Sequence, residues 1–170
     1  MTFELKTLQQ GMSKPALYGE LAEQARAMLE DERDAIANAA NLASLIWHAL
    51  PDLNWAGFYF LRNGVLVLGP FQGKPACVRI ALGQGVCGTA AQQRQSVVVA
   101  DVHDFPTHIA CDSATNAELV VPLFKGDALV GVLDLDSPLR GRFDDEDRAG
   151  VEALATIWAA RSDWHGGRGA

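Results

Sequence analysis

The order of the expected elements predicts an α+β fold in which an antiparallel sheet carries its helices on one face. Two helical segments come first, two strand hairpins occupy the middle of the chain, and a long helix closes it. Hairpins pair neighbouring strands antiparallel, and a sheet built from them needs helices on only one side. The other face is then free to carry loops, where binding and catalytic residues are concentrated.

Capping residues and apolar periodicity predict the helices. Ser13 and Pro15 are typical of a helix start, and Pro51-Asp52 ends the second helix. The closing helix begins after Phe143, where the acidic residues 144–147 suit the positive end of the helix dipole and are expected to face water. The apolar stripe expected on the second helix consists of Ile36, Ala39, Ala40, Ala43, Ile46, Trp47 and Leu50.

Glycine-containing turns predict the two hairpins. Asn63-Gly64 stands between two apolar runs, which is the strongest short hairpin signal in a sequence. Lys125-Gly126-Asp127 separates the second pair of runs. The expected strands span 54–61, 65–68, 78–81, 97–100, 119–124 and 128–135, with a short helix at 86–93.

Length and composition predict one globular domain. The chain has 170 residues, 49% hydrophobic and 21% charged, with an arm expected at about 1–13 and a frayed tail at about 163–170. The formal net charge of −7 argues against nucleic acid and anionic membrane as partners. No apolar run approaches the roughly 18 residues of a membrane span, and no secretory core is present near the N-terminus. A soluble, cytoplasmic protein is therefore expected.

The three cysteines are the first candidates for chemistry. An odd number without a secretory segment does not fit a disulfide framework. Cys87 lies at an expected helix start, where backbone N–H groups and the dipole lower the pKa of a thiol. Cys111 lies in the irregular stretch 101–116, and Cys77 lies beside a glycine-rich segment. Redox cysteines need a thiolate, access and a second thiol within reach, and these contexts fit that need better than inert packing.

A zinc site is the competing interpretation of the same region. His103, His108, Cys87 and Cys111 are residue types that zinc accepts as ligands. The sequence has no Cys-x-x-Cys pair, however, and the spacing of these residues matches no structural zinc pattern. No metal is therefore expected, and the two histidines are expected to order the loop or to face solvent.

Three acidic residues are the second candidates. Asp134 and Asp136 lie two apart at a strand end, so both side chains point to one face of the sheet. Glu118 opens the preceding strand and is expected near them across the hairpin. Such a group either emerges into water or forms an anionic pocket suited to an ammonium group or to proton donation. Strand alternation allows only one of Trp55 and Phe58 to reach this site.

Seven segments together resemble free methionine-(R)-sulfoxide reductases, which are stand-alone GAF domains. They are Leu53–Tyr59, Leu66–Gly73, Ala76–Ile80, Gly85–Ala90, Asp101–His103, His108–Asp112 and Gly131–Ser137. The resemblance covers about 15–160, and its three-cysteine pattern is specific to this enzyme among GAF proteins. Thr107 and Ala117 depart from the family pattern, which has Gly and Ser at these positions.

The resemblance implies an enzyme that reduces free L-methionine (R)-S-oxide without a cofactor. Cys111 would be the nucleophile, Cys77 the main resolving cysteine, and Cys87 a secondary partner that passes the disulfide onward. A dithiol such as thioredoxin would be the reductant, and a homodimer is expected. The implied substrate-binding residues are Trp55, Glu118, Asp134 and Asp136, with Glu118 or Asp136 as the acid.

Two other functions remain open at this level. A GAF domain can act as a ligand sensor that binds a small molecule or chromophore without chemistry. The same cysteines could also serve a thiol redox sensor or interaction module. Bound ligand after purification would favour the first alternative, and disulfide formation with peroxide but without sulfoxide turnover would favour the second.

Overall fold

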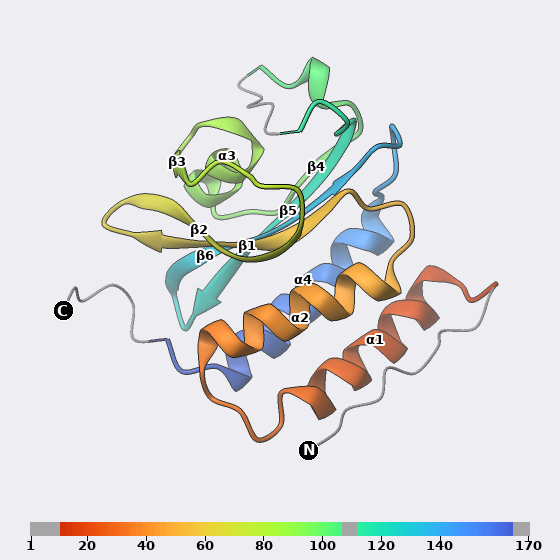
Figure 1. The fold of residues 1–170 in the computed structure, drawn as a ribbon, viewed down its shortest axis with the longest axis vertical. Helices are drawn as coiled ribbons and strands as arrows, with labels where there is room; N and C mark the ends of the chain where they lie inside the picture. Colours follow the sequence, from red (N-terminus) through yellow and green to blue (C-terminus); the bar gives the residue numbers. More distant parts are fainter. Residues whose placement is uncertain (1–10, 107–111, 165–170) are drawn as a thin grey trace.

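The computed structural model describes residues 11–106 and 112–164 and confirms the α+β prediction. Its centre is a six-stranded sheet in the order β3-β2-β1-β6-β5-β4, and every neighbouring pair is antiparallel (Figure 1). Both expected hairpins are present. The strands are β1 (Trp55–Arg62), β2 (Val65–Gly73), β3 (Arg79–Ala81), β4 (Val97–Val99), β5 (Ala117–Lys125) and β6 (Ala128–Ser137).

Three of the helices lie on one face of the sheet (Figure 1). The helices α2 (Ala35–Ala49) and α4 (Asp145–Arg161) pack directly on the strands, and α1 (Lys14–Met28) covers them from outside. The short helix α3 (Gly85–Gln93) lies on the opposite face, so that face carries a helix as well as the expected loops. No helix among the described residues is long and apolar enough to cross a membrane.

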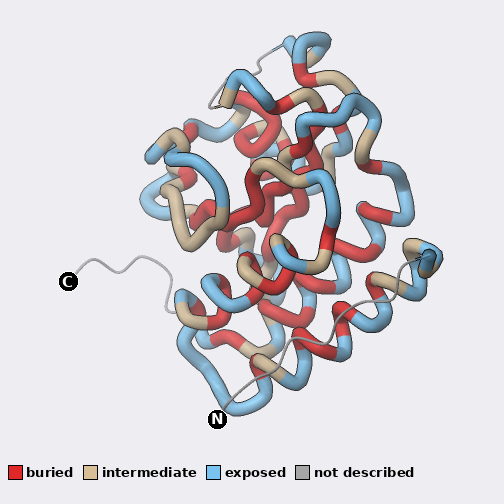
Figure 2. The backbone as a smooth tube through the Cα atoms, turned by 45° about the vertical axis from the view of Figure 1, so that its right-hand side comes forward, coloured by how far each residue is buried: buried red, intermediate tan, exposed pale blue. Residues whose placement is uncertain are grey.

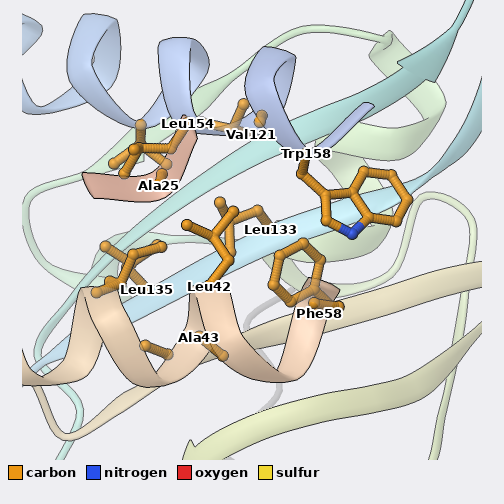
Figure 3. Packing of buried hydrophobic residues seen from close by; sticks show 14 of the residues in the cluster. Ala25, Leu42, Ala43, Phe58, Val121, Leu133, Leu135, Leu154 and Trp158 are labelled. Atoms are coloured by element: carbon orange, nitrogen blue, oxygen red, sulfur yellow. The ribbon is translucent and has the colours of Figure 1, made fainter. Parts of the chain in front are cut away.

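The main core lies between the sheet and α2 and α4. Trp158 is fully buried there, with its ring centroid 5.7 Å from that of Phe58 and 5.6 Å from that of Phe60. Figure 3 shows Leu42 of α2 and Leu133 of β6 beside this aromatic group. Along the backbone, buried residues are concentrated in the strands and in the sides of the helices that face them (Figure 2). This packing makes the sheet a rigid support for whatever its other face carries.

The apolar stripe expected on α2 is rotated in the structure. Ile36 and Ala40 are exposed, whereas Asn38 and Leu42 point inward and are fully buried. The Asn38 amide donates a hydrogen bond of 3.1 Å to the Ser162 hydroxyl. Ala39, Ala43, Ile46 and Leu50 are buried as predicted, so the prediction was wrong only at Ile36 and Ala40. The place of Asn38 was missed because a polar residue with a buried hydrogen-bond partner carries no hydrophobic signal.

The strand β2 is longer than expected and continues past Leu68 to Gly73. The expected strand ended at Leu68, directly before Gly69. In the structure a Cβ at Gly69 would lie 2.8 Å from the Phe60 ring, so this glycine permits close approach of a side chain rather than a turn. The extension matters for the site because it pairs Gly73 with Trp55.

The acidic start of α4 is only partly solvated, contrary to the expectation. Asp144 caps the helix, but Asp147 is buried and accepts a hydrogen bond of 2.9 Å from the Tyr18 hydroxyl. Lys14 pairs with Asp147 at 2.6 Å and Arg142 pairs with it at 3.2 Å. A buried carboxylate with three partners ties α1 to α4, a role that the run of acids does not reveal.

Packing continues beyond α4 to the last described residue. The Asp163 backbone N–H donates to the Arg33 carbonyl at 2.7 Å, and the two side chains form an ion pair of 2.6 Å. The Trp164 ring lies 4.6 Å from the Phe60 ring, measured between centroids. Most of the expected arm and tail (residues 1–10 and 165–170) lies outside the described residues.

Candidate active site

The sheet face opposite α2 and α4 carries a second apolar cluster. Trp55 and Tyr59 of β1 belong to it, whereas Phe58 and Phe60 lie in the main core, so the predicted alternation along β1 is confirmed. Other buried members are Val86, Cys87, Ala90 and Ala91 of α3 and Val120 and Val132 of the central strands. Between this cluster and the loops above it lies a pocket.

The three acidic residues converge in this pocket, as the sequence predicted. Glu118 is paired directly with Asp136 across β5 and β6, and Trp55 is paired with Asp136 across β1 and β6. Directly paired residues project to the same face. The pocket is lined by Trp55, Tyr59, Lys74, Pro75, Ala76, Ile80, Gln84, Gly85, Val86, Cys87, Asp112, Thr115, Glu118, Asp134 and Asp136.

Burial keeps protons on these acids. It raises the pKa of Asp134 to about 7. Burial, and then the negative charges of Asp134 and Asp136, raise the pKa of Glu118 well above its usual value. The pKa of Asp136 is raised by burial and by Asp134. The group therefore holds at least one proton at neutral pH, and a protonated carboxyl group beside a pocket can act as a general acid.

Cys87 does not have the lowered pKa that the sequence predicted. It lies in the first turn of α3, but it is a free, buried thiol whose Sγ is 3.9 Å from Oε1 of Glu118. Burial raises its pKa well above the usual value, and the negative charges of Asp134 and Glu118 add to this effect. Desolvation and two carboxylates outweigh the helix dipole, which contributes about 1 kcal/mol or less at an exposed site.

Cys77 lies in the segment between β2 and β3, is half-buried and is disulfide-bonded. Two aromatic residues hold this segment to the sheet. The Tyr59 hydroxyl donates to the Cys77 carbonyl at 3.1 Å, and Trp55 Nε1 donates to the Lys74 carbonyl at 3.2 Å. The Trp55 ring is stacked on Phe71 and on Tyr59 at centroid distances of 5.2 and 5.7 Å. Tyr59 was not predicted as a site residue, although its alternation with Trp55 pointed to it.

Cys111 lies outside the described residues, and the residue after it is firmly anchored. Asp112 accepts a hydrogen bond of 3.3 Å from Asn54 Nδ2 and forms an ion pair of 3.3 Å with Lys74. The backbone N–H of Ala114 donates to it at 2.9 Å, and this bond is the main cause of the lowered pKa of Asp112. The sequence does not reveal this anchor, because its partners come from separate segments.

One group of described residues has ligand atoms close enough together for a metal ion. A Cys87 sulfur, a Glu118 oxygen and an Asp134 oxygen all lie within 4.8 Å of one another. This group shares only Cys87 with the zinc ligands that the sequence suggested. His103 Nδ1 from that set lies 2.6 Å from Asp101, and two other members lie outside the described part of the chain.

Comparison with known proteins identifies the family. The family model of the GAF domain matches residues 16–161 of this chain. The free methionine-R-sulfoxide reductase of Escherichia coli is 49% identical over 143 residues, which are 84% of this chain and 87% of that protein. This chain belongs to the free methionine-R-sulfoxide reductase family of GAF domains.

Solved structures support the same family. The free methionine-R-sulfoxide reductase of Neisseria meningitidis, in complex with its substrate, has a TM-score of 0.88 at 41% identity and covers 93% of this chain and 95% of that one. A putative GAF sensor protein from Burkholderia vietnamiensis has a TM-score of 0.86 at 62% identity, and the match covers 89% of this chain and 96% of that one. The resemblance found in the sequence motifs is confirmed.

Proposed function

We propose that this protein reduces free methionine (R)-sulfoxide to methionine. The observation that carries the proposal is the pocket in which Glu118, Asp134 and Asp136 meet beside Trp55. The relatives from E. coli and N. meningitidis are named for this activity. The pocket has the groups that such a reaction needs, namely a proton source, a partner for an ammonium group and an apolar wall.

The carboxyl groups of the pocket provide the selectivity for the free amino acid. Free methionine sulfoxide carries an ammonium group that a methionine residue inside a peptide lacks. A carboxylate in a buried pocket is a strong hydrogen-bonding partner for that group. The Trp55 indole, stacked on Phe71 and on Tyr59, supplies an apolar surface for the methyl group of the sulfoxide. We assign substrate binding to Trp55, Glu118, Asp134 and Asp136.

The chemical step combines an acid and a thiolate. Glu118 or Asp136 donates a proton to the sulfoxide oxygen, which makes the sulfur electrophilic. The Cys111 thiolate attacks the sulfur and forms an S–S bond. The S–O bond then breaks as the hydroxyl group passes to the cysteine sulfur, and the S–S bond breaks as methionine leaves. Methionine leaves with its sulfur reduced, and Cys111 is oxidised to a sulfenic acid. The raised pKa values of both carboxyl groups support the presence of a proton at neutral pH.

A second thiol then removes the sulfenic acid. The Cys77 thiol condenses with Cys111, one water molecule leaves, and a disulfide forms. Cys77 is disulfide-bonded in the structure and Cys87 is a free buried thiol, which supports Cys77 as the main resolving residue. A dithiol such as thioredoxin reduces this disulfide by exchange, and Cys87 is a secondary partner in that relay.

A coupled assay tests the proposal. Purified protein with thioredoxin, thioredoxin reductase and NADPH is expected to consume the free R epimer and to spare the sulfoxide in peptides. C111S is expected to abolish turnover, and full turnover in C111S would refute the assignment of the nucleophile. Comparing E118Q with D136N identifies the acid, because loss of the donor lowers kcat whereas loss of a binding group alone raises KM.

The same preparation separates the alternatives. A nucleotide or pigment retained at one per chain, without reductase activity, would indicate a ligand sensor. A disulfide formed with peroxide, without sulfoxide turnover, would indicate a redox sensor. Sedimentation of the reduced protein tests the proposed homodimer, and omission of thioredoxin from the assay tests the proposed reductant.

A further inference from the structure

Cys87, Glu118 and Asp134 form a buried group with more bonding capacity than the described part of the chain uses. Their exposed fractions are 4%, 7% and 5%. Oδ1 of Asp134 is buried and accepts no hydrogen bond from any residue in 11–106 or 112–164. All three side chains line the same pocket. An unpartnered carboxylate oxygen beside a free thiol is a feature that a bound cation would explain.

We propose that Cys87, Glu118 and Asp134 form an inhibitory binding site for a thiophilic divalent cation such as Zn²⁺. One sulfur and two oxygens supply three ligands, and a water molecule from the pocket completes four-coordination. With Zn–S of about 2.3 Å and Zn–O of about 2.1 Å, tetrahedral geometry places sulfur and oxygen about 3.6 Å apart and the two oxygens about 3.4 Å apart.

The side chains already lie near this geometry. The distance from Cys87 Sγ to Glu118 Oε1 is 3.9 Å, and no pair in the group exceeds 4.8 Å. Side-chain rotations that move the ligand atoms by about 1 Å or less therefore complete the site. The adjacent space of about 40 Å³ holds a cation with a few water molecules.

The donor set selects among metal ions. Mg²⁺ and Ca²⁺ take six or more oxygen ligands, which this group does not offer among the described residues. A thiolate with two carboxylates suits Zn²⁺ and, in the same geometry, Co²⁺. Binding releases to solvent the protons that burial keeps on the thiol and the carboxyl groups, and the dication then compensates the negative charge of its ligands.

Inhibition follows from overlap with the substrate site, and this part rests on the proposed function. Glu118 and Asp134 are residues that we assign to the sulfoxide substrate. A cation bound to their oxygens removes a partner of the ammonium group and, at Glu118, a candidate proton donor. The cation and the substrate therefore exclude each other, and inhibition is competitive with methionine sulfoxide.

Binding is tested first without any activity measurement. The double variant C77S/C111S, kept reduced with a phosphine, has Cys87 as its single thiol. It is expected to bind one Co²⁺ per chain with a thiolate-to-cobalt absorption band that Zn²⁺ removes. Adding C87S is expected to abolish the band, and adding D134N is expected to weaken Co²⁺ binding at least tenfold. D112N is the matched control, because Asp112 lines the same pocket outside the group, and it is expected to keep the band.

The outcomes distinguish the site from the function. Absence of the band in C77S/C111S, or its persistence after C87S is added, would refute the site. In the coupled assay, Zn²⁺ is expected to inhibit the wild-type protein, and a chelator is expected to relieve this inhibition. The apparent inhibition constant is expected to rise with substrate concentration. Inhibition that does not vary with substrate concentration would refute the overlap. A band without turnover in metal-free protein would refute the proposed function and retain the site.

Discussion

Replacing Tyr59 with phenylalanine isolates one hydrogen bond that holds the Cys77 segment to the sheet. The Tyr59 hydroxyl donates to the Cys77 carbonyl at 3.1 Å, and its ring is 2% exposed. Burial raises the pKa of Tyr59, so the hydroxyl keeps its proton and remains a donor. Phenylalanine fills the same space and keeps the stacking on Trp55, so Y59F removes the donor and little else.

The expected loss follows from the type of bond. A neutral hydrogen bond contributes about 0.5–1.5 kcal/mol net to folding. Cys77 is half-buried, so water can reach its carbonyl after the substitution and the loss stays near 1 kcal/mol. In a domain of this size the midpoint of thermal unfolding falls by about 2–4 °C. If the bond positions Cys77 for condensation with the oxidised Cys111, the same energy slows that step by about fivefold.

Single-turnover experiments measure the two steps separately. Reduced Y59F is mixed with methionine (R)-sulfoxide, quenched with an alkylating agent, and analysed for methionine and for disulfide. Methionine release is expected at the wild-type rate, and disulfide formation about fivefold slower. Y18F is the matched control, since the Tyr18 hydroxyl bonds Asp147 at 2.9 Å on the far side of the sheet. It is expected to lose stability and to keep both rates. If Y59F loses the expected stability of about 1 kcal/mol but forms the disulfide at the wild-type rate, the positioning role is refuted.

Three further substitutions test the packing and the charges. G57A places a Cβ against the Cβ and Cα of Phe71 on the paired strand and 2.7 Å from the Trp55 ring, so it is expected to cost about 1–3 kcal/mol of stability. Because the Trp55 ring must also move, G57A is expected to raise KM more than it lowers kcat, and an unchanged KM would contradict the placement of the indole. L42A is expected to cost about 2–5 kcal/mol in urea unfolding with no change in KM, and a loss below 1 kcal/mol would contradict its place in the core. In D144N the pairing with Lys14, which lowers the pKa of Asp144 from 3.8 to about 2, is lost while the cap is retained. Because Asp144 is half-exposed, D144N is expected to be less stable than wild type by up to about 1 kcal/mol above pH 4, with the difference disappearing as the pH falls towards 2. A difference that is as large at pH 2 as above pH 4 would contradict this assignment.

The sequence was sufficient where one local pattern decides the structure. Asn63-Gly64 has positive φ at both residues, as its turn requires, and the two flanking strands pair as expected. Asp134 and Asp136 share a face because side chains alternate along a strand, and the hairpin places Glu118 opposite Asp136. Such patterns depend on neighbours in the chain, so they can be read without knowing the tertiary structure.

The sequence was insufficient where distant segments meet. The pKa of Cys87 is raised by burial and then by carboxylates from β5 and β6, so its place at a helix start led to the wrong direction of shift. Asn38 lies on the buried face of α2, and its partner Ser162 lies beyond the end of α4. The anchor at Asp112 needs Asn54 and Lys74, which belong to two other segments. In each case the partner lies many residues away in the chain, and no local sequence pattern predicts it.

One face of the sheet stabilises the folded state and the other destabilises it, and this division explains how the pocket can exist. Two buried carboxyl groups, the half-buried Asp136 and a buried free thiol destabilise the folded state, because burial disfavours their charged forms. The other face compensates with the aromatic core around Trp158 and with strands that continue through the sheet beneath the pocket. The same strands supply both faces, since alternate residues of β1 and β6 point to the core and to the site. Substitutions that neutralise the acids should therefore increase stability while they reduce turnover, which is the relation expected of residues retained for chemistry.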